Sequence, residues 1–513
     1  MLRVGIDVGG TNTDAVLMDG NRPVEWVKMN NSADITAGIV AALNQLLAHT
    51  HVATDQIGAV MIGTTQFTNA VVQRRDLAQV AAVRLGLPAT QSLPPMVDWP
   101  DDLREAVGNC HFLAHGGYEF DGRVIAPLDE TELRQIGAEI RGRTIRHVAI
   151  SAVFSPINAE MERQAAEIIG AEVPDARITL SEEIGRIGLL ERENAAILNA
   201  CLRELGSGTV AAYGDALAAA GIAAPLFLTQ NDGTLMAAEY AQRFPVLTFA
   251  SGPTNSMRGA AFLSGLREAL VVDIGGTTTD VGALQHGFPR EAGVAVAVGG
   301  VRTNFRMPDV LSIGLGGGSL VSADGLTVGP QSVGYRLVTE GLIFGGQTLT
   351  ATDVAVAAGW VTLGDADRVR GLDGNLVTRA LATIAQMLET ACDRMRLTPQ
   401  PIPVLVVGGG SILVQDCIGP LEVIRPPYYP VANAVGAAIA QISGEIDRVY
   451  ALADLSREKA LGDAKAEATR RAVEAGADPA SVQIVDVEEV PLAYLPSNAT
   501  RIHVKAVGDL SLV

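Results

Sequence analysis

One acidic, glycine-rich string occurs twice in this chain of 513 residues, each time between two apolar runs. The first copy is D-V-G-G-T-N-T-D at residues 7–14, and the second is D-I-G-G-T-T-T-D at residues 273–280. The flanking runs are short and rich in aliphatic residues, and they lie at residues 2–6, 16–18, 269–272 and 281–284. Such runs are typical of buried strands, so each copy predicts a β-hairpin with a glycine turn and an acid at both shoulders.

The two turns have the composition of a phosphate-binding site. Paired glycines allow positive φ and let a ligand approach the backbone, while backbone N–H groups and threonine hydroxyls can bind an anion. A single glycine turn would be weak evidence, but two near-identical copies strengthen the prediction. The predicted phosphate contacts are Gly9, Gly10, Thr11, Asn12, Thr13, Gly275, Gly276, Thr277 and Thr278.

The first acid of each copy, Asp7 or Asp273, is the candidate catalytic and metal-binding residue. A carboxylate at a strand end is costly to bury unless it binds a metal or accepts hydrogen bonds, and it can hold Mg²⁺ against the same phosphates. Capping of the turn is the alternative role for both. The second acids, Asp14 and Asp280, lie beyond the turns and could serve only to brace the threonines.

The duplication also predicts the architecture. Two related halves, each opening with a phosphate loop, suggest two α/β domains that face each other across a nucleotide cleft. This pattern resembles the actin-like ATPase superfamily, in which a later glycine pair contacts adenosine. The string V-L-V-V-G-G-G-S at residues 404–411 fits that third element. The resemblance implies an α/β fold with two actin-like (ribonuclease H-like) domains, ATP as the nucleotide, and adenosine contacts from Gly408, Gly409 and Gly410.

The chain is expected to divide into three parts. Residues 1–195 would form the first actin-like domain, and residues 196–442 would form the second, which holds the second hairpin and the adenosine glycines. Residues 443–513 would form a small C-terminal α+β appendage, whose expected role is packing or oligomer contact rather than catalysis. Within it, residues 443–474 are charged and alanine-rich, which predicts an exposed pair of helices ahead of two strand-like segments.

A narrower resemblance rests on motifs between these landmarks. The string G-T-T-Q-F-T-N-A at residues 63–70 is similar to the G-T-T-x-x-T-N-A element of the hydantoinase A and 5-oxoprolinase family. Further family-like segments follow in order at residues 229–233, 251–253, 313–319 and 328–330. The resemblance covers the chain from Met1 to about Gly359. It implies that Thr64, Thr65 and Asn69 contact the substrate, just past a strand end where α/β folds place ligands.

The chain also departs from that family. Asn12 stands where members usually have an aromatic residue, and residues 251–256 read S-G-P-T-N-S where many members have S-G-P-A-G-G. The typical A subunit is also longer at its C-terminus. These departures leave open the identity of the substrate and the need for a hydantoinase B-type partner.

The resemblance implies hydrolysis of a cyclic amide, such as a hydantoin, lactam or oxoproline, driven by ATP. Transfer of the γ-phosphoryl group to the carbonyl oxygen would make an intermediate that water can attack, with Mg²⁺ and the hairpin amides neutralising phosphate charge. A carboxylase subunit that acts on a ketone is the near alternative. A non-hydrolase ATPase switch or reactivating chaperone is a second alternative, and a sugar or acetate kinase is a third.

Composition limits the partners. A formal charge of −19 argues against binding to nucleic acid or to an anionic membrane. The only lysines, at positions 28, 459, 465 and 505, leave no G-x-x-x-x-G-K-[ST] loop, so nucleotide binding rests on the hairpins.

The four scattered cysteines have no C-x-x-C spacing and are predicted to be reduced core residues. Because the N-terminus lacks a signal-like segment and no apolar run is long enough to span a bilayer, we expect a cytoplasmic protein, and we expect it to be oligomeric.

Overall fold

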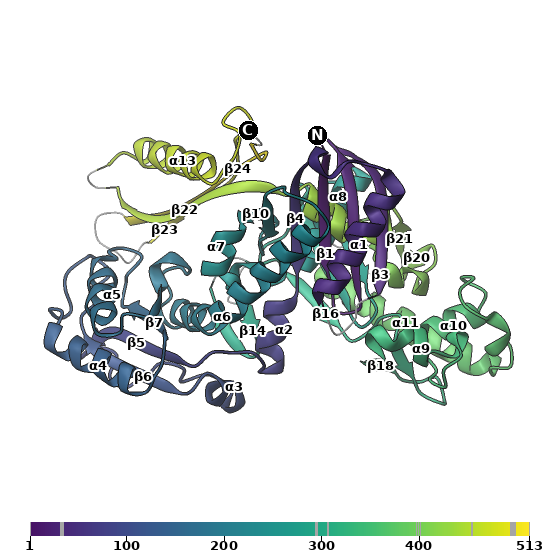
Figure 1. Cartoon of the computed structure of the whole chain (residues 1–513), viewed down its shortest axis with the longest axis horizontal. Coiled ribbons are helices and arrows are strands. Elements are labelled where there is room, and N and C mark those ends of the chain that lie inside the picture. The colour runs from purple at the N-terminus through teal and green to yellow at the C-terminus, as the bar shows by residue number, and fades with distance from the viewer. Residues whose placement is uncertain are drawn as a thin grey trace.

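The computed structural model is an α/β structure in which strands alternate with helices (Figure 1), which confirms the α/β part of the predicted fold class. The arrangement as two actin-like domains around a nucleotide cleft stays a prediction. A four-stranded sheet with its helices lies at one end of the long axis, and α9 (Leu337–Glu340), α10 (Ala351–Ala357) and α11 (Gly374–Met395) lie at the other. The model describes residues 2–30, 35–292, 296–304, 307–396, 398, 400, 402–452, 455–492 and 499–511.

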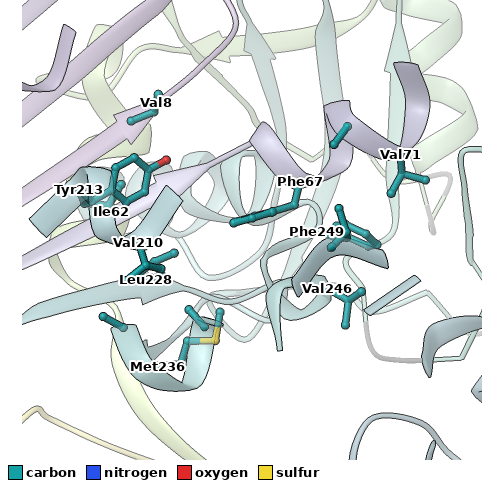
Figure 2. Packing of buried hydrophobic residues seen from close by; sticks show 14 of the residues in the cluster. Val8, Ile62, Phe67, Val71, Val210, Tyr213, Leu228, Met236, Val246 and Phe249 are labelled. Atoms are coloured by element: carbon teal, nitrogen blue, oxygen red, sulfur yellow. The ribbon is translucent and has the colours of Figure 1, made fainter. Parts of the chain in front are cut away.

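A nine-stranded sheet contains the first hairpin, and its strand order is β23-β24-β22-β10-β9-β4-β1-β2-β3. In chain order these strands are β1 (Leu2–Val8), β2 (Asn12–Asp19), β3 (Arg22–Asn30), β4 (Ile57–Thr64), β9 (Leu226–Thr229), β10 (Thr234–Ala237), β22 (Gln441–Ala451), β23 (Gln483–Pro491) and β24 (Ala499–Gly508). The helices that share its main apolar core are α1 (Ile35–Thr50), α2 (Gln66–Gln73), α6 (Leu189–Ala219) and α7 (Ala238–Arg243). Figure 2 shows part of that core, where Phe67 of α2 and Tyr213 of α6 pack among aliphatic side chains.

A seven-stranded sheet contains the second hairpin, in the order β13-β12-β11-β19-β21-β20, with β16 paired to β12. In chain order its strands are β11 (Ala269–Ile274), β12 (Thr279–Gln285), β13 (Phe288–Pro289), β16 (Val310–Ile313), β19 (Val404–Val407), β20 (Cys417–Ile418) and β21 (Leu421–Ile424). Its core also takes apolar side chains from α10 and α11. The hairpins of the two repeats therefore belong to two different sheets.

The four-stranded sheet is wholly parallel and has the order β6-β5-β7-β8. Its strands are β5 (Val80–Leu87), β6 (Cys110–His115), β7 (His147–Ala152) and β8 (Arg177–Leu180), and α4 (Glu130–Gly142) and α5 (Glu160–Glu172) share its core. Leu103 of the short helix α3 (Asp101–Ala106) belongs to the main core of the nine-stranded sheet. A buried ion pair between Arg84 of β5 and Glu193 of α6 ties this sheet to the long helix. Two small antiparallel pairs complete the sheets, namely β14 (Val296–Val298) with β15 (Val301–Thr303) and β17 (Ser319–Val321) with β18 (Val328–Ser332).

The C-terminal region corrects one prediction. The exposed helical pair expected at residues 443–474 is wrong, because β22 occupies residues 441–451 and α13 (Arg457–Glu474) is the one helix among the described residues of this range. Strands β22, β24 and β23 extend the nine-stranded sheet, so these residues are not a separate appendage. Ile442, Ile446 and Tyr450 of β22 are buried in alternation with polar neighbours, a strand pattern that the high charge obscured. The domain boundaries at residues 195 and 442 stay predictions.

Two helices cross between the large sheets. Helix α8 (Ser251–Ser264) leads from the nine-stranded sheet to β11, and α12 (Ala432–Ala438) leads back to β22. They pack in close backbone contact, because a Cβ added at Gly259 would lie 1.8 Å from the carbonyl oxygen of Ala432. A Cβ at Gly436 would lie equally close, 1.8 Å, to the carbonyl oxygen of Asn255. Side chains at either glycine would force the helices apart.

Three of the four cysteines, Cys110, Cys201 and Cys392, are buried and unbridged, as predicted. Cys417 is exposed at the edge strand β20, so its assignment to the core is wrong. Within the described ranges, no helix combines the length and apolar character that crossing a membrane would need.

Candidate active site at the paired hairpins

Both repeats fold as the predicted hairpins, in the same register. Asp7 of β1 pairs with Asp14 of β2, and Asp273 of β11 pairs with Asp280 of β12. Each turn is closed by an equivalent bond, from the N–H of Gly9 to Asn12 O at 3.0 Å and from the N–H of Gly275 to Thr278 O at 2.9 Å. The two copies therefore form matching structures.

The prediction that the paired glycines have positive φ is wrong. None of Gly9, Gly10, Gly275 and Gly276 has positive φ. Their missing side chains matter instead at the meeting of the two turns, because a Cβ added at Gly276 would lie 2.7 Å from Thr11 Oγ1. The structure thus brings the tips of both hairpins into contact.

The other predicted phosphate residues differ in exposure. Thr277 and Thr278 are exposed, Thr11 and Asn12 are partly buried, and Thr13 is fully buried in β2. The hydroxyl of Thr13 is therefore not on the surface that a ligand would meet, whereas the turn residues before it are.

The third glycine element lies against the second hairpin. Gly408 follows β19 with φ +85°, and a Cβ there would lie 2.3 Å from Asp273 Oδ1. A Cβ at Gly410 would lie 2.7 Å from the carbonyl oxygen of Gly275. Gly409 has more room, since the nearest atom to its added Cβ is Lys28 Cε at 4.0 Å. This loop and β3, which carries Lys28, therefore border the same space.

The acids of the first hairpin are held by side chains from distant segments. Asn433 of α12 donates from Nδ2 to Asp7 Oδ2 at 3.0 Å and to Asp14 Oδ2 at 2.9 Å. Lys28 Nζ lies 2.5 Å from Asp14 Oδ1. Asp7 is 5% exposed, and its Oδ1 accepts no hydrogen bond from the described residues. Burial, aided by the charges of Asp14 and Asp273, raises the pKa of Asp7 to about 7.

The acids of the second hairpin have serine partners. Ser256 of α8 donates to Asp273 Oδ2 at 2.5 Å, while burial raises the pKa of Asp273. Ser312 of β16 donates to Asp280 Oδ1, and burial raises the pKa of Asp280 to about 6. Asp7 and Asp14 are thus buried, whereas Asp273 and Asp280 are partly exposed.

The G-T-T segment ends β4 beside Asp7. In the parallel ladder Asp7 pairs with Gly63 and Val8 pairs with Thr64. A Cβ added at Gly63 would lie 2.7 Å from Asp7 Oδ1 and 2.3 Å from Nδ2 of Asn255. Only glycine therefore fits between the catalytic candidate and α8.

The three predicted substrate residues are not equivalent. Thr64 is buried, and its Oγ1 accepts a hydrogen bond from Tyr213 Oη at 3.0 Å. Thr65, at the start of α2, is partly exposed, and Asn69 is exposed one turn later. Gly252 of the S-G-P segment lies next to Thr65, because its added Cβ would be 3.3 Å from Thr65 Cγ2. The structure gathers the G-T-T and S-G-P segments at one sheet edge.

Sequence reasoning missed five residues at this site. Lys28, Tyr213, Asn255, Ser256 and Asn433 contact the hairpin acids or the G-T-T segment. Two signals were available: lysine is rare in this chain, and the T-N-S of residues 254–256 departs from the pattern of the family it resembles. Tyr213 and Asn433 carried no such signal.

A cavity of about 540 Å³ lies elsewhere. It is bounded by the turn after β9 and by strands β13, β23 and β24. Asp232 and Lys505, which line it, form a buried ion pair at 2.6 Å. None of the predicted hairpin, glycine-loop or substrate residues lines this cavity. We therefore locate the candidate active site from the converging motifs and not from the cavity.

Sequence comparison identifies relatives over most of the chain. Residues 3–173 match the hydantoinase/oxoprolinase N-terminal region, and residues 192–395 match hydantoinase/oxoprolinase. The acetophenone carboxylase gamma subunit of Aromatoleum aromaticum is 27% identical over 397 residues, which cover 70% of this chain and 53% of that protein. The caprolactamase subunit alpha of Pseudomonas jessenii is 26% identical over 399 residues, which cover 71% of this chain and 55% of that protein. The chain thus spans about half the length of these relatives.

Two solved structures share the fold. An ATP-dependent caprolactamase from Pseudomonas jessenii aligns with a TM-score of 0.79 and 20% identity, covering 99% of this chain and 88% of that one. A nucleotide-free acetone carboxylase aligns with a TM-score of 0.72 and 18% identity, with the same coverage, 99% and 88%. At this identity the likeness concerns the fold, and the two family matches carry the assignment. The chain belongs to the hydantoinase/oxoprolinase family.

Proposed function

We propose that this chain hydrolyses ATP to drive the opening of a cyclic amide. The observation that carries the proposal is the convergence of both hairpins, the 408–410 glycine loop and the end of β4 around Asp7 and Asp273. The two hairpins and the glycine loop would form a nucleotide site, and the end of β4 would form a substrate site next to it. Adjacent sites are what transfer of a phosphoryl group to an amide oxygen requires.

On the nucleotide side, the chain supplies mostly backbone groups. The turns at residues 9–11 and 275–278 would bind the phosphates through N–H groups and the exposed threonine hydroxyls. The glycine loop would receive the adenosine beside Gly409, where the nearest atom to an added Cβ is Lys28 Cε at 4.0 Å. Lys28, which is paired with Asp14, borders this space and would offset phosphate charge.

Asp7 and Asp273 fit a hard divalent cation. Carboxylate oxygens are preferred magnesium ligands, and Oδ1 of Asp7 is a buried acceptor without a partner among the described residues. No group of three or more histidine, cysteine or acidic side chains in the described part is arranged to hold a metal. When bound, magnesium would neutralise phosphate charge during transfer. The two acids would orient that ion and an attacking water.

On the substrate side, Thr65 lies beside Gly252 near Asp7, and Asn69 offers an exposed amide one turn later in α2. They would hold the amide so that its carbonyl oxygen faces the γ-phosphoryl group. Phosphorylation releases ADP and turns a poor electrophile into an imidoyl phosphate. A water would then attack its carbon and the protonated ring nitrogen would leave, which opens the ring and gives an acyl phosphate. A second water would release phosphate and leave the carboxylate. Positioning, more than side-chain acid–base chemistry, would provide the rate enhancement.

A carboxylase subunit is the second candidate. It is favoured by the relative named acetophenone carboxylase gamma subunit and by the fold shared with acetone carboxylase. In that case the same site would phosphorylate the oxygen of a ketone enolate. Because the named relatives are subunits, we also propose that this chain acts with a second, B-type protein. The cytoplasmic location and an oligomeric state stay predictions.

Phosphate release by the purified chain tests the proposal. The assay would use ATP and magnesium with a panel of hydantoins, lactams, oxoproline and ketones, with and without proteins that co-purify from the native host. We expect at least one cyclic amide to stimulate release. Stimulation by ketones alone would favour the carboxylase, and stimulation by neither class would contradict both candidates.

A further inference from the structure

Helix α8 touches both hairpin acids with neighbouring side chains. Ser256 donates to Asp273 Oδ2 at 2.5 Å, and Nδ2 of Asn255 and Oδ1 of Asp7 lie on the same side of Gly63, 2.3 and 2.7 Å from the place of its missing Cβ. Both side chains are 1% exposed. Asp7 and Asp273 belong to different sheets, so these two residues form a direct link between the halves of the proposed site.

The amide of Asn255 is itself fixed in place. Its Nδ2 donates to Thr229 Oγ1 at 3.0 Å, where β9 ends beside β4. Residues 229–233 are the T-Q-N-D-G segment, to which the proposed reaction assigns no role. Thr229 thus holds the Asn255 amide between the nine-stranded sheet and Asp7.

The position of α8 is set by α12. The carbonyl oxygen of Asn255 packs on Gly436, and Gly259 packs on the carbonyl oxygen of Ala432, with no space for a Cβ at either glycine. From α12, Asn433 donates to Asp7 and Asp14. One rigid pair of helices therefore presents polar groups to the acids of both hairpins.

We propose that Asn255 and Ser256 are positioning residues that hold Asp7 and Asp273 in one fixed relative geometry for phosphoryl transfer. This inference rests on the proposed function. The Ser256 hydroxyl fixes which oxygen of Asp273 stays available, because Oδ2 is engaged and Oδ1 faces Gly408. Asn433 engages Oδ2 of Asp7 in the same way, and the Asn255 amide lies beside its Oδ1 and limits the space into which Asp7 can rotate. A shift of α8 would displace the carboxylates of Asp7 and Asp273 together.

Three variants test the role of Ser256. Ser256→Ala removes the hydroxyl, while Ser256→Cys keeps nearly the same volume but donates only a weak hydrogen bond. Both should lower kcat for ATP hydrolysis at least about tenfold, with KM for ATP changed less than about threefold, because the lost bond is to a charged group. Ser264→Ala is the matched control, since this serine donates to Ala260 O at the other end of α8 and should keep wild-type kcat.

The outcomes separate positioning from packing. If Ser256→Cys keeps wild-type kcat while Ser256→Ala does not, the residue only fills space and the proposal is wrong. Equal losses in Ser256→Ala and Ser264→Ala would also overturn it, because they would reflect a weakened helix.

A crystal structure of Ser256→Ala gives a readout that needs no turnover. We expect the Asp273 carboxylate to rotate away from its wild-type position, and an unmoved carboxylate would overturn the proposal. If the wild type releases no phosphate but Asp273 does move, the proposed function fails while the positioning role stands.

Discussion

A methyl group added at Gly408 should disrupt the second hairpin, whereas one added at Gly409 should be tolerated. Gly408 has φ +85° and ψ 165°, a conformation that non-glycine residues rarely adopt. Its added Cβ would lie 2.3 Å from Asp273 Oδ1 and 2.5 Å from the carbonyl oxygen of Ile274. Backbone strain costs about 1–3 kcal/mol and overpacking another 1–3 kcal/mol. We therefore expect Gly408→Ala to lower the free energy of unfolding by about 2–6 kcal/mol.

Urea unfolding and calorimetry with ADP measure the two effects. Gly409→Ala should change the free energy of unfolding by less than about 1 kcal/mol, because its new methyl meets only Lys28 Cε at 4.0 Å. If the loop contacts adenosine as proposed, the same variant should weaken ADP binding. Equal stability of Gly408→Ala and Gly409→Ala would show that our account of how this loop packs on Asp273 is wrong.

Three further predictions concern the same site. Gly276→Val should abolish nucleotide binding in calorimetry, because its Cβ would lie 2.7 Å from Thr11 Oγ1 and force the hairpin tips apart; wild-type affinity would contradict the paired-hairpin site. Asp7→Asn should stabilise the fold at pH 8 but not at pH 4. Burial raises the pKa of Asp7 from its ordinary value of 3.8 to about 7. The folded wild type therefore loses stability as the pH rises from the first value through the second, by up to about 4 kcal/mol, and asparagine avoids this loss. Thermal unfolding at both pH values measures this, and a variant less stable than wild type at pH 8 would refute it. Tyr213→Phe removes only the hydroxyl bonded to Thr64 and keeps the ring packing seen in Figure 2, so we expect a stability loss of about 1 kcal/mol and a lower kcat/KM for the amide with an unchanged KM for ATP. Steady-state kinetics that show an altered KM for ATP alone would contradict the placement of Thr64 on the substrate side.

The hairpins could be predicted because their signals are local. Each string carries its own strand pattern, turn glycines and acids, and the pairing of Asp7 with Asp14 follows once the turn is placed. The end of β4 was predictable for the same reason, since a buried strand runs directly into Gly63 and Thr64. Chemistry carried within about ten residues can be read from the sequence.

The contacts that orient the acids could not be predicted in this way. Asn433 lies 426 positions after Asp7 in the chain, and its own segment consists mostly of small residues with no recognisable motif. Those small residues let α12 pack closely on α8, a tertiary requirement with no local signature. Strand β22 was missed because its outward positions carry charges such as Glu445 and Asp447, which masked the alternation of Ile442 and Ile446.

The most direct test of the central claim compares Asp7→Asn and Asp273→Asn with the wild type. Asparagine keeps the shape of aspartate but removes the charge that would face magnesium and the phosphates. Phosphate release measures turnover, calorimetry measures nucleotide affinity, and circular dichroism checks the fold. We predict that both variants stay folded and lose ATP turnover. Wild-type turnover in both would show that these acids only cap their turns and that the repeated hairpins do not form an ATP-hydrolysing site.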